Sequence, residues 1–294
     1  MKVPTHHKLF AAAFTALAVS ACASTASKPQ AIPFDAPVVD DEFIGEQRAA
    51  LALEIAGVGY GPQSPRDIDS IEGNNNRAFS AAPAYTQMNL CNIHFHESAE
   101  HKGGEFTTYA GNGNGAGAGT GYLYSGELSE AELASIGEEI GTGKYGTLEP
   151  GDTIEVHYVH SSAQVEPGAT LGACLSDAVI NPQLRVETQV YVLVNDENAL
   201  NFMELTEIGE VNGYQQALNI PGNTGTPVQY SGSTTGPSYN KKASPIKVSW
   251  SVRPQVAKVD IRTVGTWLAD NVFAEKDAHG VRNLVTNPDL LSAK

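Results

Sequence analysis

Four segments of the chain are dense in β-branched and aromatic residues, and their pattern favours strands. They are residues 88–95, 153–160, 185–194 and 246–252. Side chains of these types pack well on a pleated surface. Gly-rich and Asn-rich stretches separate the four segments, as expected of connections between strands. The pattern therefore predicts a mainly β (α+β) fold with a sheet at its core.

Two short helices and one loop are predicted between these strands. Residues 46–56 carry apolar side chains at helical spacing, namely Ala49, Leu51, Ala52 and Ile55. Residues 129–140 begin with Ser129 and Glu132, which have the spacing of a capping box at a helix start. Residues 111–121 are rich in Gly, and we expect a loop there.

The N-terminus has the pattern of an export signal. Basic residues are followed by an apolar run, residues 9–21, that is too short to span a bilayer. The run ends in Val-Ser-Ala before Cys22, which resembles a bacterial lipobox, in which the cysteine is acylated and becomes the new N-terminus. The alternative is a soluble secreted protein that is cleaved one or two residues away.

These features predict three parts of the chain. Residues 1–21 form a lipoprotein-type signal peptide, residues 22–42 a flexible tether rich in Ala, Ser and Pro, and residues 43–294 the folded domain. We expect an exported protein anchored through Cys22, facing the periplasm or the cell surface. Ala23 after the cysteine favours the outer membrane of a bacterium.

Charge and cysteine count narrow the partners and the compartment. The formal net charge of −15 makes nucleic acid an improbable partner, because phosphate binding depends on clustered Lys and Arg. Only Cys91 and Cys174 remain in the exported domain, and an isolated pair in an oxidising compartment forms a disulfide. Two thiolate metal ligands are the weaker alternative, since odd spacing on a strand puts Cys91 and His94 on opposite faces.

Histidines cluster in two of the predicted strands. His94 and His96 are two residues apart, so both point to one face, and alternation places His157 on the face of its strand that also carries Glu155. Three imidazoles leave the fourth position of a tetrahedral zinc open, which is the layout of a catalytic site. Glu155 and Glu100 are candidates for outer hydrogen bonds to these ligands.

We do not expect the other three histidines of the predicted domain to bind metal. We expect His101 and His160 to be hydrogen-bonded within the fold, His101 together with Glu155 as an outer contact of the metal ligands, and His279 to lie on the surface.

Four segments occur in the order that α-class carbonic anhydrases show, and the longer run Leu90–Phe106 is closer still to the δ class. The resemblance covers roughly residues 57–285. It implies a single domain on a large, mostly antiparallel sheet with a few short helices, as in the α class. The segments are Gly61–Ile68, His94–His96 with Glu100–His101, Glu155–His157 with His160, and Gly232–Pro237 followed by Val248–Trp250.

The resemblance also implies roles for single residues. His94, His96 and His157 would hold Zn²⁺, for which Cd²⁺ or Co²⁺ could substitute, and Glu155 would orient His157. The gatekeeper threonine that accepts a hydrogen bond from zinc-bound hydroxide would be Thr235 or Thr234, with Glu100 as its proton acceptor.

The implied activity is reversible hydration of CO₂ to bicarbonate and a proton. Arg77 stands where the α class has a proton-shuttle histidine, and an arginine cannot give up a proton at ordinary pH. An apolar wall near the substrate would come from Val190, Val192 and Val194, or from their odd-numbered neighbours.

Two other functions stay open at this point. His94 and His96 followed by Glu100 are also compatible with a cupin-like metal enzyme, although Met88 and Thr107 stand where that pattern expects glycines. A lipid-anchored zinc-binding or zinc-delivery protein without catalysis is the second alternative.

Overall fold

A computed structural model describes residues 36–58, 61–70, 72–233 and 246–292. All of them belong to one compact unit, Ile32–Lys294. The signal peptide, Cys22, Thr234 and Thr235 lie outside the described residues. No helix in the described part of the chain has the length and apolar character needed to cross a membrane.

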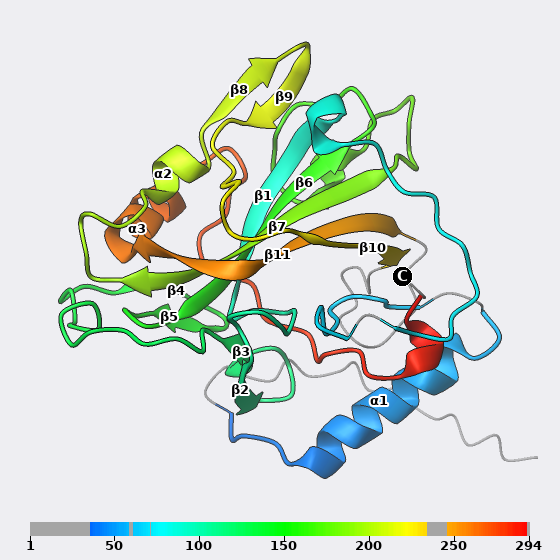
Figure 1. Cartoon of the computed structure of the whole chain (residues 1–294), viewed down its shortest axis with the longest axis horizontal. Helices are drawn as coiled ribbons and strands as arrows, with labels where there is room; N and C mark the ends of the chain where they lie inside the picture. The colour runs from blue at the N-terminus through cyan, green and yellow to red at the C-terminus, as the bar shows by residue number, and fades with distance from the viewer. Residues whose placement is uncertain (1–35, 59–60, 71, 234–245, 293–294) are drawn as a thin grey trace, which may run out of the picture. The chain divides into compact units, whose positions relative to one another are not determined.

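Short strands make up most of the regular structure, as Figure 1 shows. The strands are β1 (Asn89–Glu97), β2 (Thr108–Asn112), β3 (Thr120–Leu123), β4 (Ile140–Gly143), β5 (Gly146–Leu148), β6 (Thr153–Ser161), β7 (Leu184–Val194), β8 (Ile208–Val211), β9 (Tyr214–Ala217), β10 (Val228–Ser233) and β11 (Lys247–Asp260). The α-helices are α1 (Asp41–Ile55), α2 (Phe202–Leu205) and α3 (Ile261–Ala269).

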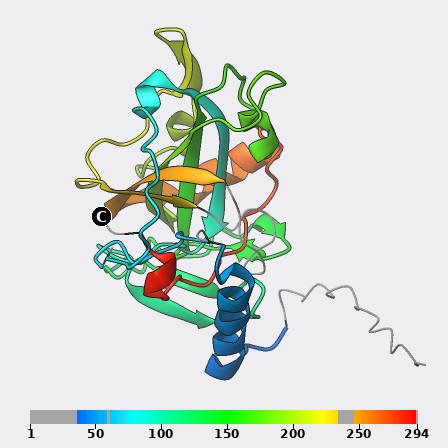
Figure 2. The ribbon, with the colours of Figure 1, turned by 90° about the vertical axis from the view of Figure 1, so that its right-hand side faces the viewer.

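A five-stranded sheet in the order β1-β6-β7-β11-β10 forms the centre of the unit. Its pairs are antiparallel except for β7 with β11, which run parallel (Figure 1). The other strands form two-stranded hairpins, and the hairpin β8–β9 projects beyond the end of the central sheet (Figures 1 and 2). The mainly β fold and the mostly antiparallel sheet are therefore confirmed.

Each face of the sheet covers its own apolar cluster. One cluster contains Ile154, Val156 and Tyr158 of β6 together with Tyr191 and Leu193 of β7. The other contains alternate residues of the same strands, including Val159, Val186 and Val190, and Trp250 of β11. The period of two that the sequence showed along residues 153–160 thus separates two buried faces.

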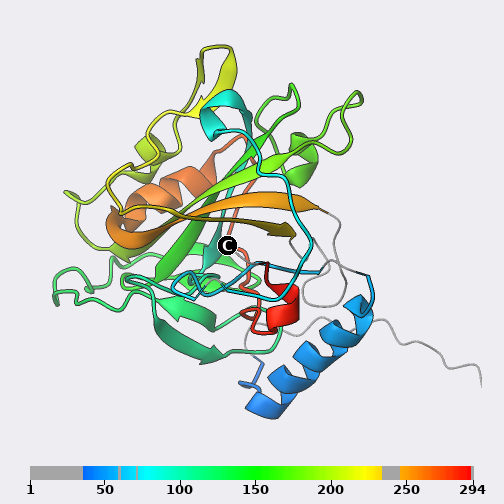
Figure 3. The same cartoon turned by 45° about the vertical axis from the view of Figure 1, so that its right-hand side comes forward.

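The first predicted helix is present and longer than expected. α1 begins at Asp41 because the Asp40 carboxylate caps it, accepting a hydrogen bond from the Phe43 backbone N–H at 2.9 Å. Its buried residues Leu51 and Ile55 pack against the C-terminal segment at Val285, Leu290 and Leu291, and Figure 3 shows the two side by side.

The second predicted helix, over residues 129–140, was wrong. The capping-box contacts form, since the Glu132 carboxylate accepts hydrogen bonds from the Ser129 N–H and hydroxyl at 2.8 and 2.9 Å. However, the Glu132 carbonyl accepts from the Asn195 N–H at 2.9 Å, and its carboxylate pairs with Lys258 at 2.5 Å. Tertiary partners thus take the groups that a helix would use, and the segment forms turns.

The Gly-rich segment 111–121 connects β2 to β3, in agreement with the predicted loop. The Asn114 side chain accepts hydrogen bonds from the Ala116 and Ala118 N–H groups and so orders the turn.

Cys91 and Cys174 form a disulfide, as predicted. The pairing of β1 with β6 shifts register between Leu90 and Asn92, which is the mark of a β-bulge. Cys91 therefore packs with Val159 and Val186, on the face that carries the histidines. The expectation that odd spacing separates Cys91 from His94 was wrong because of this bulge.

His160 is fully buried on the opposite face of β6. Its Nδ1–H donates to the Tyr158 carbonyl at 3.0 Å, and its Nε2 has no hydrogen-bond partner among the described residues. Burial lowers the pKa of His160 to about 3; the bond to the Tyr158 carbonyl opposes this shift, and the nearby Arg185 charge adds to it. His160 is thus a structural histidine, as expected.

Removing the disulfide should lower stability. Cys91 and Cys174 are 83 residues apart, and a loop of this size predicts a loss of up to about 4 to 5 kcal/mol from the chain entropy of the unfolded state. We expect Cys91→Ala with Cys174→Ala to unfold at lower urea concentration than the oxidised wild type. In the presence of reductant, the wild type and the double variant should unfold at similar urea concentrations. Equal unfolding free energies without reductant would contradict the prediction.

His160 should make the fold sensitive to acid. Between its unfolded pKa of about 6.5 and its folded pKa of about 3, only the unfolded chain binds the proton. The free energy of unfolding therefore falls as pH falls, by up to about 1.4 kcal/mol per pH unit. His160→Gln should show a shallower decline between pH 6.5 and pH 5 in urea titrations. If the unfolding free energy of both proteins had the same slope against pH, protonation of His160 would not be the cause of the acid sensitivity.

Candidate metal centre

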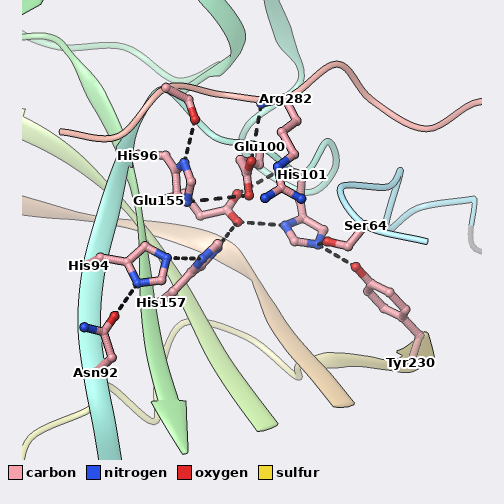
Figure 4. Close-up of polar contacts among 11 residues, drawn as sticks. Ser64, Asn92, His94, His96, Glu100, His101, Glu155, His157, Tyr230 and Arg282 are labelled. Atoms are coloured by element: carbon pink, nitrogen blue, oxygen red, sulfur yellow. Dashed lines mark hydrogen bonds and ion pairs between the residues drawn. The ribbon is translucent and has the colours of Figure 1, made fainter. Parts of the chain in front are cut away.

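The register between β1 and β6 brings the three predicted ligands together. His94 lies directly opposite His157, and His96 lies opposite Glu155. Cross-strand partners in an antiparallel pair share a face, so all four side chains project from one side of the sheet. Figure 4 shows the three imidazoles turned toward one another.

The imidazoles of His94 and His157 have the spacing of two ligands of one metal ion. The ring centroids are 5.1 Å apart for His94 and His157, 5.4 Å for His94 and His96, and 4.9 Å for His96 and His157. His157 Nδ1 and His94 Nε2 are separated by 3.3 Å. Tetrahedral zinc with Zn–N bonds of about 2.0 to 2.1 Å needs two ligand nitrogens about 3.4 Å apart.

Outer hydrogen bonds decide which nitrogen of each ring is available. His94 Nδ1–H donates to the Asn92 side-chain oxygen at 2.6 Å, and His96 Nδ1–H donates to the Gly280 carbonyl at 2.9 Å. Both rings are therefore held in the tautomer that leaves Nε2 with a free lone pair. Sequence reasoning assigned neither Asn92 nor Gly280 a role.

Glu155 performs the same task for His157. The carboxylate, fully buried, accepts a hydrogen bond from His157 Nε2–H at 2.7 Å, so His157 presents Nδ1. It also accepts from the backbone N–H and Nδ1–H of His101 at 2.9 and 2.7 Å. His101 Nε2 in turn contacts the Tyr230 hydroxyl at 2.7 Å and the Ser64 hydroxyl at 3.4 Å (Figure 4). Glu155 and His101 thus lie where the sequence predicted outer contacts.

The electrostatics keep the His94 and His96 imidazoles neutral and the Glu155 carboxylate charged. Burial, together with the neighbouring imidazoles, lowers the pKa of His94 well below its usual value. Burial also lowers the pKa of His96, to about 4. Burial alone would raise the pKa of Glu155, but His101 and His157 outweigh it and hold the pKa well below its usual range. Neutral imidazoles with free lone pairs are the form that binds a metal.

Glu100 lies at the edge of the same cluster. Its carboxylate is 3.7 Å from His96 Nε2 and accepts a hydrogen bond from the Arg282 backbone N–H at 3.3 Å. Burial would raise the pKa of Glu100, but His96 and Arg282 lower it below its usual value. Glu100 also forms a possible ligand group with His96 and His157. Its predicted threonine partners, Thr234 and Thr235, fall outside the described residues.

The His279 side chain is partly exposed, as predicted, but it also contacts the histidine cluster, which sequence reasoning missed. Its ring stacks on His94 at a centroid distance of 5.0 Å and meets His96 edge-on at 5.6 Å. Burial would lower the pKa of His279, but the Glu275 carboxylate, 2.7 Å from Nε2, raises it above the usual value. No sequence pattern marks this position, because His279 stands alone in an irregular segment.

The apolar wall beside the histidines comes from alternate residues of the neighbouring strands. Val190 and Thr188 of β7 lie opposite Glu155 and His157, so the even-numbered residues of β7 share the histidine face. The Trp250 ring closes this face at a centroid distance of 5.2 Å from His157. The sequence left open whether even- or odd-numbered residues of this strand face the histidines, and the structure shows that the even-numbered ones do.

Arg77, at the proposed shuttle position, lines a cavity of about 690 Å³ whose walls also include Arg185, Ser231 and Ser249. Arg185 lies opposite His160 in the pairing of β6 with β7, on the face away from the histidine cluster.

Two similar solved structures are an alpha-carbonic anhydrase from Thermovibrio ammonificans with the inhibitor sulfanilamide and an alpha-carbonic anhydrase from Photobacterium profundum. The first is 14% identical, covers 79% of this chain and 86% of its own, and has a TM-score of 0.27. The second is 15% identical, covers 85% and 97%, and has a TM-score of 0.27. No curated protein matches.

A comparison with protein families matches residues 85–263 to the family described as Delta carbonic anhydrase. The matched region is more than half of the chain and includes His94, His96 and His157. The chain therefore belongs to the delta carbonic anhydrase family.

Proposed function

We propose that this protein catalyses the reversible hydration of CO₂ to bicarbonate and a proton, with zinc held by His94, His96 and His157. One observation carries the proposal. Each of the three rings donates one N–H to an outer acceptor and turns its other nitrogen toward the common centre. The free nitrogens of His94 and His157 face each other at 3.3 Å, and two lone pairs at this distance call for a cation between them.

Zinc at this position would lower the pKa of a bound water and so supply the nucleophile at neutral pH. The chain's own groups do the rest. Asn92, Gly280 and Glu155 fix the tautomers, Val190 and Trp250 exclude water beside the small uncharged substrate, and the Glu100 carboxylate accepts a hydrogen bond from the gatekeeper hydroxyl.

We also propose export and lipid anchoring through Cys22, on the strength of its lipobox-like context. The Cys91–Cys174 disulfide supports an oxidising compartment.

Stopped-flow CO₂ hydration, with metal content measured on the same sample, tests the function. We expect one zinc per chain and hydration well above the buffer rate in the wild type. His157→Ala should lose both, while His160→Gln, on the opposite face of the same strand, should keep both. Full zinc occupancy without hydration would instead favour a zinc-binding protein. Iron or manganese as the native metal would favour a cupin-like enzyme.

Glu155→Gln should weaken zinc binding by roughly ten- to a hundredfold, as the loss of an outer partner does in other metal sites. The amide still fills the space but cannot accept from His101 and His157 with a full negative charge. Competition with a chelator of known affinity measures the change. Glu187→Gln, which alters a buried carboxylate on the far face of the sheet, is the matched control. Equal affinities in Glu155→Gln and the wild type would exclude this role.

A further inference from the structure

The segment around His279 extends the sheet beyond its β1 edge. The His279 N–H donates to the Phe95 carbonyl at 2.8 Å, and the Glu97 N–H donates to the His279 carbonyl at 3.0 Å. These two bonds form a parallel bridge in which His279 is the lateral neighbour of His96. Lateral neighbours share a face, so four imidazoles project from the same side of three adjacent chain segments.

The fourth imidazole lies close enough to share an ion with the others. Metal-binding atoms of His94, His96 and His279 all lie within 4.8 Å of one another. Ligands of tetrahedral zinc stand about 3.4 Å apart, and the His279 ring stacks at 19° on the His94 ring, so His279 must turn as well as move by roughly 1.5 Å or less to share the ion. The His279 side chain is 43% exposed, which leaves it room to turn.

His279 also has the outer partner that a metal-binding histidine needs. Its Nε2–H donates to the Glu275 carboxylate at 2.7 Å, and this bond leaves Nδ1 available. His157 is held by Glu155 in the same way, with Nε2 outward and Nδ1 inward. The Glu275 side chain is only 12% exposed, so the pair is partly shielded from water.

We propose that His279 is a fourth ligand, which competes with solvent and substrate for the metal position that His94, His96 and His157 leave open. The inference rests on the proposed zinc site and adds that His279 regulates access to the metal. With His279 bound, the centre is closed and holds its metal more tightly. With His279 released, it is the open three-imidazole centre of the proposed function.

Nuclear magnetic resonance of the protein labelled with ¹⁵N-histidine and loaded with ¹¹³Cd²⁺ counts the ligated rings, since only a bound nitrogen couples to cadmium. We expect four coupled imidazoles in the wild type and three in His279→Gln. Zinc affinity, measured by chelator competition, should fall at least about tenfold in His279→Gln, comparable to the loss of an outer partner. Lys276→Gln, in the same segment, should match the wild type in both measurements.

Three coupled rings in both the wild type and His279→Gln would overturn the inference. So would an unchanged zinc affinity in His279→Gln, even where cadmium recruits the fourth ring. Either result leaves the proposed function intact if CO₂ is hydrated and the three remaining rings are His94, His96 and His157. Absence of cadmium coupling at every histidine would overturn the zinc site together with this inference.

Discussion

The register of β1 against β6 is the constraint on which the site depends. With His94 directly opposite His157, the two strands place imidazoles and Glu155 on one face. A slip of one residue would turn the side chains of one strand to the other face and bring Ile93 or Phe95 to the centre. The apolar cluster on the far face, which contains Ile93, resists such a slip because its buried side chains would then meet the polar side.

Charge balance links this geometry to a cation. Glu155 and Glu100 are both buried, and both have a pKa below the usual value, so the cluster holds two carboxylates in the charged form. Burial meanwhile favours neutral rings at His94 and His96. Buried negative charges are costly unless a positive group lies nearby. The proposed divalent zinc supplies that charge, which couples metal binding to the stability of the sheet.

The sequence predicted the parts of this arrangement that follow from local periodicity. Alternation along residues 153–160 assigned His157 and Glu155 to one face and His160 to the other, and the structure agrees. The failures have tertiary causes. The segment around Glu132 forms a turn because its carbonyl and carboxylate bond to Asn195 and Lys258. The position of Cys91 depends on a β-bulge, which the sequence pattern does not predict. Gly280 contacts His96 from 184 residues away along the chain, and sequence spacing carries no information on such contacts.

The segment that carries His279 and Gly280 explains why the site needs the C-terminal part of the chain. The Gly280 carbonyl orients His96, the Arg282 N–H bonds Glu100, and the Val281 N–H donates to Gly117 of the β2–β3 loop at 2.9 Å. A Cβ atom at Gly280 would lie 2.4 Å from the Tyr145 ring, so a larger residue fits only if this ring moves. The acceptor that holds the tautomer of His96 therefore depends on the packing of the C-terminal segment against β1, and so does the proposed metal centre.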